Sequence, residues 1–106
     1  MIVAVFRSRL NAAAQDEYKV WASRMSELAA GIPGYVSHKS YMADDAEKVT
    51  IVEFESEEGL RIWATHPQHV AAKKKGRELF FTEYRVQVCS VMRDSGKRQM
   101  QEVSSN

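Results

Sequence analysis

The sequence has one cysteine, Cys89, among its 106 residues. A single cysteine cannot form a disulfide within the chain, and it cannot supply a multi-cysteine zinc or iron–sulfur site. Cys89 lies in an alternating pattern typical of a strand, so we expect it to be a small buried hydrophobe rather than a reactive thiol.

Charge of one sign and long apolar runs are also scarce. The formal net charge is +1, so no overall field favours nucleic acid or an anionic membrane. No segment approaches the roughly 18 apolar residues of a membrane-spanning helix. The apolar start, 1–6, is shorter than the core of a secretion signal. We therefore expect a cytoplasmic protein with neither a nucleic-acid partner nor a membrane partner.

Hydrophobic periodicity predicts an alternation of strands and helices. The expected order is a strand at 2–10, a helix at 15–30, strands at 35–43 and 48–54, two helices between Ser56 and about Phe80 that are separated at Pro67, and a strand at 81–92. This order predicts the α+β, ferredoxin-like split βαβ fold, a four-stranded antiparallel sheet with helices on one face. Residues 1–92 form the predicted domain, and residues 93–106 form a polar C-terminal tail.

The predicted strands are apolar on both faces. Val3 and Val5 alternate with Ala4 and Phe6, and the third strand shows the same feature. Because the helices can cover one face only, the other face predicts a homodimer in which a second copy packs on the sheet.

Two local motifs accompany this order: Pro33-Gly34-Tyr35 after the first helix, and the run from Phe54 to Trp63. Together they resemble the antibiotic biosynthesis monooxygenase superfamily, which includes quinol monooxygenases and heme-degrading enzymes. The resemblance implies a dimeric α+β barrel with a cavity between sheet and helices in each subunit. It also implies, for some members, oxidation of anthrones or hydroquinones by molecular oxygen with no metal, flavin or other cofactor.

The heme-degrading branch uses an asparagine on the first strand and a histidine on the later helix. The corresponding stretches here read Arg7-Ser8-Arg9 and Lys73-Lys74-Lys75. Both differences count against heme.

The candidate chemistry gathers between residues 63 and 77. Trp63 is either a large core residue or, as the resemblance implies, a cavity wall on which a flat aromatic substrate stacks. His66 and His69 flank Pro67 and are candidate acid–base groups, because an imidazole titrates near neutrality. The alternative is that one histidine caps the helix and the other is solvated. No carboxylate or thiol completes a metal site, so no metal is expected.

Further candidates lie outside this pair of histidines. Arg77 could stabilise a developing oxyanion, although a run of Lys and Arg on a helix is more often a solvated face. His38 is predicted to point inward from the second strand as a substrate contact. Tyr41 and Tyr84 are predicted core aromatics with hydroxyls at the edge of the cavity.

These observations favour a cofactor-independent monooxygenase that oxidises a small planar aromatic of the hydroquinone or anthrone type. Trp63 would bind the substrate, His66 or His69 would accept its proton, and a cation would hold the charge that develops. The alternative is a non-catalytic domain of the same fold that binds a small ligand or serves a stress response.

Overall fold

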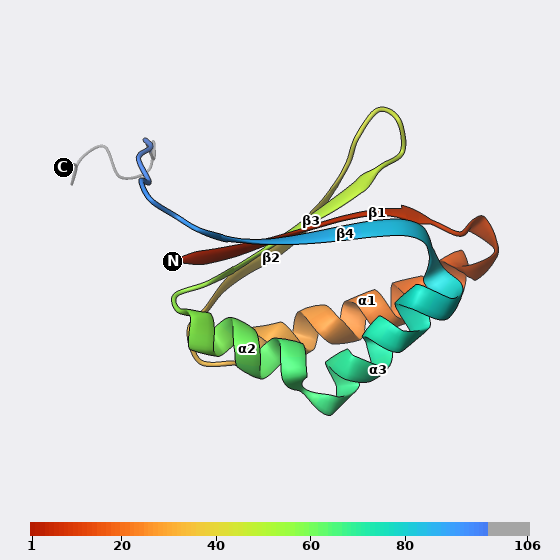
Figure 1. The fold of residues 1–106 in the computed structure, drawn as a ribbon, viewed down its shortest axis with the longest axis horizontal. Helices are drawn as coiled ribbons and strands as arrows, with labels where there is room; N and C mark the ends of the chain where they lie inside the picture. The colour runs from red at the N-terminus through yellow and green to blue at the C-terminus, as the bar shows by residue number, and fades with distance from the viewer. Residues whose placement is uncertain (98–106) are drawn as a thin grey trace.

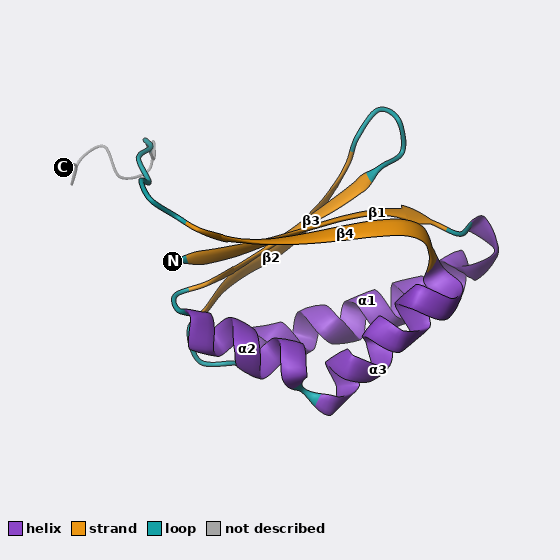
Figure 2. Cartoon of the chain, in the orientation of Figure 1, coloured by secondary structure: helices purple, strands orange, loops and turns teal. Residues whose placement is uncertain are grey.

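One antiparallel sheet of four strands carries all the helices on a single face (Figure 1, Figure 2). The computed structural model describes residues 1–97. The sheet order is β2-β3-β1-β4, which confirms the ferredoxin-like α+β fold. The elements are β1 (Ile2–Leu10), α1 (Gln15–Ala30), β2 (Tyr35–Met42), β3 (Lys48–Phe54), α2 (Glu57–Thr65), α3 (Pro67–Lys75) and β4 (Phe81–Ser90), with a short 3-10 turn at Ala12–Ala14 and a π-helical turn at Gly76–Phe80.

Two strands end earlier than predicted. β2 stops at Met42 because the amide of Ala43 already donates to the Glu47 carbonyl at 2.8 Å and so begins the turn into β3. β4 stops at Ser90, which pairs with Ile2, the first residue of β1. Residues 98–106 of the predicted tail lie outside the described part of the chain.

The register of the strands separates the two faces of the sheet. Ala4 lies opposite Val52 on β3, and both are buried against the helices. Their neighbours Val5 and Ile51 also pair, but they point to the other face, where they are partly exposed. The prediction that the sheet is apolar on both faces is therefore confirmed.

Cys89 belongs to this second face. It pairs with Val3 across the ladder between β1 and β4, and its side chain is exposed. The prediction of a buried cysteine is wrong for the single chain, because no helix within residues 1–97 covers this face and β4 lies at the edge of the sheet.

The turn between β2 and β3 is fastened to β1 by two arginines. The Arg7 guanidinium donates to both carboxylate oxygens of Glu47, at 3.0 and 3.1 Å. Arg9 donates to the carboxylate of Asp45 at 2.7 Å, and this hydrogen bond holds the pKa of Asp45 below its usual value. These contacts fix the hairpin that carries β2 along the sheet.

The start of α2 sets which of its side chains face the sheet. The Ser56 hydroxyl accepts a hydrogen bond from the Gly59 amide at 3.4 Å and caps the helix. A Cβ at Gly59 would lie 2.9 Å from both the Phe54 ring and the Pro33 carbonyl oxygen. Glycine therefore allows α2 to approach β3 closely, and this approach turns Trp63 toward the core.

Candidate functional site

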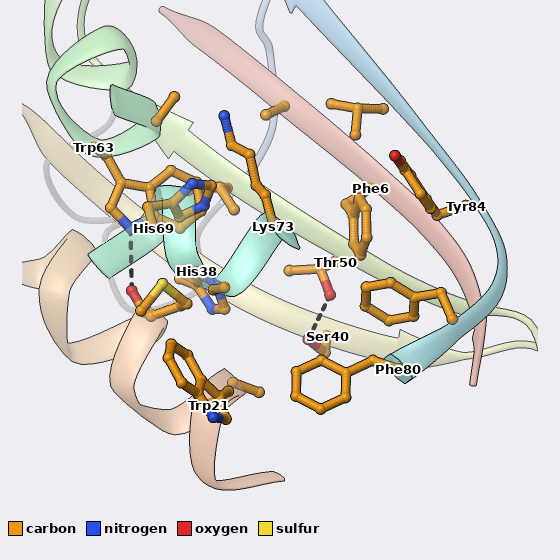
Figure 3. Close-up of a pocket in the computed structure, with 18 of the residues that line it drawn as sticks. Phe6, Trp21, His38, Ser40, Thr50, Trp63, His69, Lys73, Phe80 and Tyr84 are labelled. Atoms are coloured by element: carbon orange, nitrogen blue, oxygen red, sulfur yellow. Dashed lines mark hydrogen bonds between the residues drawn. The ribbon is translucent and has the colours of Figure 1, made fainter. Parts of the chain in front are cut away.

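A cavity of about 450 Å³ lies between the sheet and the three helices. Its walls are mostly aromatic and aliphatic, with Trp63 at one end and the rings of Phe6 and Phe80 farther along (Figure 3). The hydroxyls of Ser40 and Thr50 also line it and bond to one another at 2.8 Å. A cavity of this size, apolar with a few polar groups, is typical of sites that bind small molecules.

Trp63 is both a core residue and a wall of this cavity. Its side chain is buried among the central hydrophobic residues, and its indole Nε1 donates to the Met25 carbonyl of α1 at 3.2 Å. This hydrogen bond satisfies the one polar atom of the indole and fixes the orientation of the ring. The two readings of Trp63 from the sequence are therefore compatible.

His69 lies against the indole. The centres of the His69 and Trp63 rings are 4.2 Å apart, and their planes are inclined at 55°. The Nδ1 atom of His69 is buried and has no hydrogen-bond partner within residues 1–97. Burial, with a smaller contribution from the positive charge of Lys73, lowers the pKa of His69 to about 4. At neutral pH this imidazole is uncharged.

His38 approaches the same indole from the sheet. It lies on β2, lines the cavity and meets the Trp63 ring edge-on at 5.9 Å between ring centres. Burial, and after it the charge of Lys48, lowers its pKa below the usual value. The prediction that His38 points inward is confirmed, and Trp63 has one neutral imidazole from β2 and another from α3 (Figure 3).

His66 has a different place. Its Nδ1 accepts a hydrogen bond from the amide of Gln68 at 3.1 Å, so it is the N-cap of α3. It is not among the residues that line the cavity. Of the two histidines predicted as acid–base candidates, the structure brings His69 to the site and uses His66 to start the helix.

Of the two predicted tyrosines, likewise, only one lies at the cavity. Tyr84 lines the cavity from β4. Tyr41 pairs with Val49 on the opposite face of the sheet and is 54% exposed. The prediction of Tyr41 as a core aromatic at the cavity edge is wrong, because residues three apart on a strand point to opposite faces and His38 already points inward.

Two cationic side chains line the cavity, one from α3 and one from the π-helical turn that follows it. Arg77, the candidate oxyanion group, lines the cavity, and so does Lys73. His69, Lys73 and Arg77 are spaced four residues apart, which places them on one side of a helix. This spacing is the signal in the sequence that could have singled out Lys73 from its two neighbouring lysines.

Within residues 1–97, no group of three or more His, Cys, Asp or Glu side chains is arranged to hold a metal ion. In the same part of the chain, no helix combines the length and the apolar character needed to cross a membrane.

A family model, the stress responsive A/B barrel domain, matches residues 5–88. The chain belongs to this family, and through it to the antibiotic biosynthesis monooxygenase superfamily that the sequence motifs indicated. It is similar to YqjZ, an uncharacterized protein of Bacillus subtilis, with 33% identity over 90 residues that cover 85% of this chain and 79% of that protein.

The fold of this chain is also similar to those of solved structures. Rv0793 from Mycobacterium tuberculosis superposes with a TM-score of 0.78 at 17% identity, covering 90% of this chain and 98% of that one. SnoaB, a cofactor-independent oxygenase from Streptomyces nogalater, superposes with a TM-score of 0.74 at 17% identity, covering 91% and 97%. At these identities the likeness establishes the shared architecture.

Proposed function

We propose that the protein is a cofactor-independent monooxygenase that oxidises a small planar aromatic of the anthrone or hydroquinone type with molecular oxygen. The observation that carries this proposal is the uncharged His69 ring against Trp63 at the wall of an apolar cavity. The superfamily and the similarity in fold to a cofactor-independent oxygenase support it.

The chemistry begins with a proton transfer. For an anthrone, a benzylic proton moves to an imidazole nitrogen of His69, and the electron pair stays on the substrate as a delocalised carbanion. The indole of Trp63 stacks on the planar substrate and holds the reacting carbon near the imidazole. The apolar walls exclude water, which strengthens each polar interaction inside the cavity.

Molecular oxygen supplies the oxidant. The carbanion transfers electrons to O₂ and forms a carbon–oxygen bond, which gives a hydroperoxide after the imidazolium returns its proton. Cleavage of the O–O bond, with loss of the second benzylic proton, leaves a carbonyl and water. One substrate and one O₂ thus become one quinone and one water, and no cofactor is consumed.

The second candidate is a binding domain that holds the same kind of aromatic without turnover. The observation that favours it is the pKa of about 4 for His69, because an imidazole of such low basicity is a weak general base in the empty site. The stress responsive family description is compatible with either function.

Oxygen consumption separates the two candidates. Wild-type protein is incubated with a panel of anthrones and hydroquinones in an oxygen electrode, beside variants His69→Gln, Trp63→Phe and His38→Gln. We expect oxygen uptake in the wild type and a loss of at least about 100-fold in His69→Gln, the lower end of what a general base usually contributes. Binding of the same compounds with no oxygen uptake would establish the binding domain instead.

The predicted homodimer belongs to the same proposal. Val3, Val5 and Ile51 form an apolar strip on the face of the sheet that no helix covers. A second copy of the chain packed on this face would bury the strip. The cytoplasmic location stays a prediction.

A further inference from the structure

We propose that the aromatic ligand of this cavity carries an ionised acidic group, which Lys73 and Arg77 bind while its planar body lies against Trp63. This inference rests on the proposed function, since it concerns the ligand of the same cavity. It narrows the substrate class from quinols and anthrones in general to those that carry an acidic group.

The first support is the sign of the charge in the cavity wall. Lys73 and Arg77 line the cavity, and no Asp or Glu of the described residues does so. His38 and His69 add no negative charge in either protonation state. A site with cationic groups and no carboxylate favours an anion over a neutral or cationic ligand.

The second support is that these cations have no carboxylate partner in the described chain. Lys75, two residues from Lys73, forms an ion pair with Glu17 at 2.8 Å. Neither Lys73 nor Arg77 takes part in an ion pair within residues 1–97. Their charges therefore remain available to a ligand, whereas that of Lys75 is used to hold α3 against α1.

The third support is the position of the ammonium relative to the aromatic wall. In Figure 3 the Lys73 side chain extends from α3 past the His69–Trp63 pair, with Phe6 on its other side. A planar ligand placed against Trp63 would bring an acidic substituent within reach of the lysine. Arg77, one helical turn farther along, extends the cationic stripe.

An acidic ligand would also make His69 a stronger base. The positive charge of Lys73 is the second cause of the low pKa of His69. A bound anion compensates that charge and itself favours the imidazolium, so the pKa of His69 rises toward its ordinary value when the site is filled. An aromatic acid would thereby increase the basicity of the imidazole that accepts its proton.

The experiment compares two ligands of nearly the same shape, one charged and one neutral. Binding of 2-naphthoate and 2-naphthamide is measured by isothermal titration calorimetry at pH 7 and low salt. We expect the wild type to bind the naphthoate about tenfold more tightly, a typical effect of one charge-assisted contact. Added sodium chloride should weaken binding of the naphthoate and leave that of the naphthamide unchanged.

Two matched variants assign the effect to its residue. Lys73→Met should bind the naphthamide as the wild type does and lose most of the preference for the naphthoate. Lys74→Met removes an adjacent charge that does not line the cavity, and it should keep the preference. Lys73 is exposed, so its substitution is compatible with folding, which a thermal melt checks.

The outcomes distinguish this inference from the proposed function. If the wild type binds both compounds equally, or if Lys73→Met and Lys74→Met behave alike, the acid-binding inference is overturned while the cavity remains a ligand site. If neither compound binds, both the inference and the aromatic-binding function are overturned.

Discussion

His69 combines two properties that rarely occur together in one side chain. Its ring packs on the buried indole of Trp63 as a hydrophobic residue would, yet its Nδ1 is left without a hydrogen-bond partner in the described chain. A buried polar atom without a partner costs about 1–3 kcal/mol. A scaffold gains nothing from that cost, whereas a site that binds or deprotonates a ligand keeps the imidazole available for it.

The low pKa of His69 makes a prediction about stability. The pKa is about 4 in the folded protein, against an ordinary value of 6.5. Between these values the unfolded chain binds a proton at His69 that the folded chain does not, so the free energy of unfolding falls as the pH falls through this window. Allowing for partial exposure, we expect a loss on the order of 2 kcal/mol between pH 7 and pH 4.

Urea denaturation at several pH values, in wild type and His69→Gln, measures this loss. The charged and titratable groups that face His69 are Lys73, His38 and His66, and all three are retained in the variant. The variant should therefore have a flatter dependence on pH over this window, whatever its stability at pH 7. Parallel pH profiles for the two proteins would show that His69 does not have a lowered pKa.

The sequence predicts which side chains face the cavity only where the alternation of a strand alone determines their direction. Strand alternation predicts the inward direction of His38, and His38 lines the cavity. The same alternation, carried three residues farther, puts Tyr41 on the opposite face, where the structure has it. The choice between His66 and His69 could not be made, since it depends on the chain direction at Pro67, which turns one imidazole toward the Gln68 amide and the other toward the indole.

At the scale of elements, the helices and strands were predictable because each change of period coincides with a turn or a cap. Gly34, at φ +89°, supplies the left-handed residue between α1 and β2, and Ser56 supplies the cap of α2. The ends of β2 and β4 were less predictable, because a strand ends where its pairing partner ends. The local sequence pattern of a strand does not indicate where its partner ends.

The cap of α3 gives a prediction that separates structure from catalysis. His66→Ala removes the acceptor for the Gln68 amide and should lower the free energy of unfolding by ~1 kcal/mol, as other lost caps do. His66→Asn supplies another good cap and should retain stability near that of the wild type. Chemical denaturation measures both.

Oxygen uptake and naphthoate binding complete this comparison. Both His66 variants should keep these properties near wild-type levels, because the imidazole does not line the cavity. A folded His66→Asn protein that consumes no oxygen, beside an active wild type, would return His66 to the catalytic candidates.

At the scale of the whole molecule, the two faces of the sheet differ in how far they are covered. The inner face packs against the helices and lines the cavity. The outer face, on the side away from the helices, has the strip of valine and isoleucine that the single chain leaves partly exposed. The ion pairs of Arg7 and Arg9 lie at one end of that face and tie the hairpin down there. An apolar centre beside a polar end is a suitable surface for a two-fold related copy.

A second copy on this face predicts the mass of the protein in solution. Size-exclusion chromatography with light scattering should give twice the 12.1 kDa of one chain. Val5→Glu places a charge in the middle of the apolar strip, opposite Ile51, and should shift the mass toward that of one chain because a buried unpaired charge is costly. Val20→Glu, at an exposed apolar position on α1, adds the same charge on the helical side and should leave the mass unchanged. A wild type with the mass of one chain, or a Val5→Glu protein with the same mass as the wild type, would mean that the sheet face is not where two copies meet.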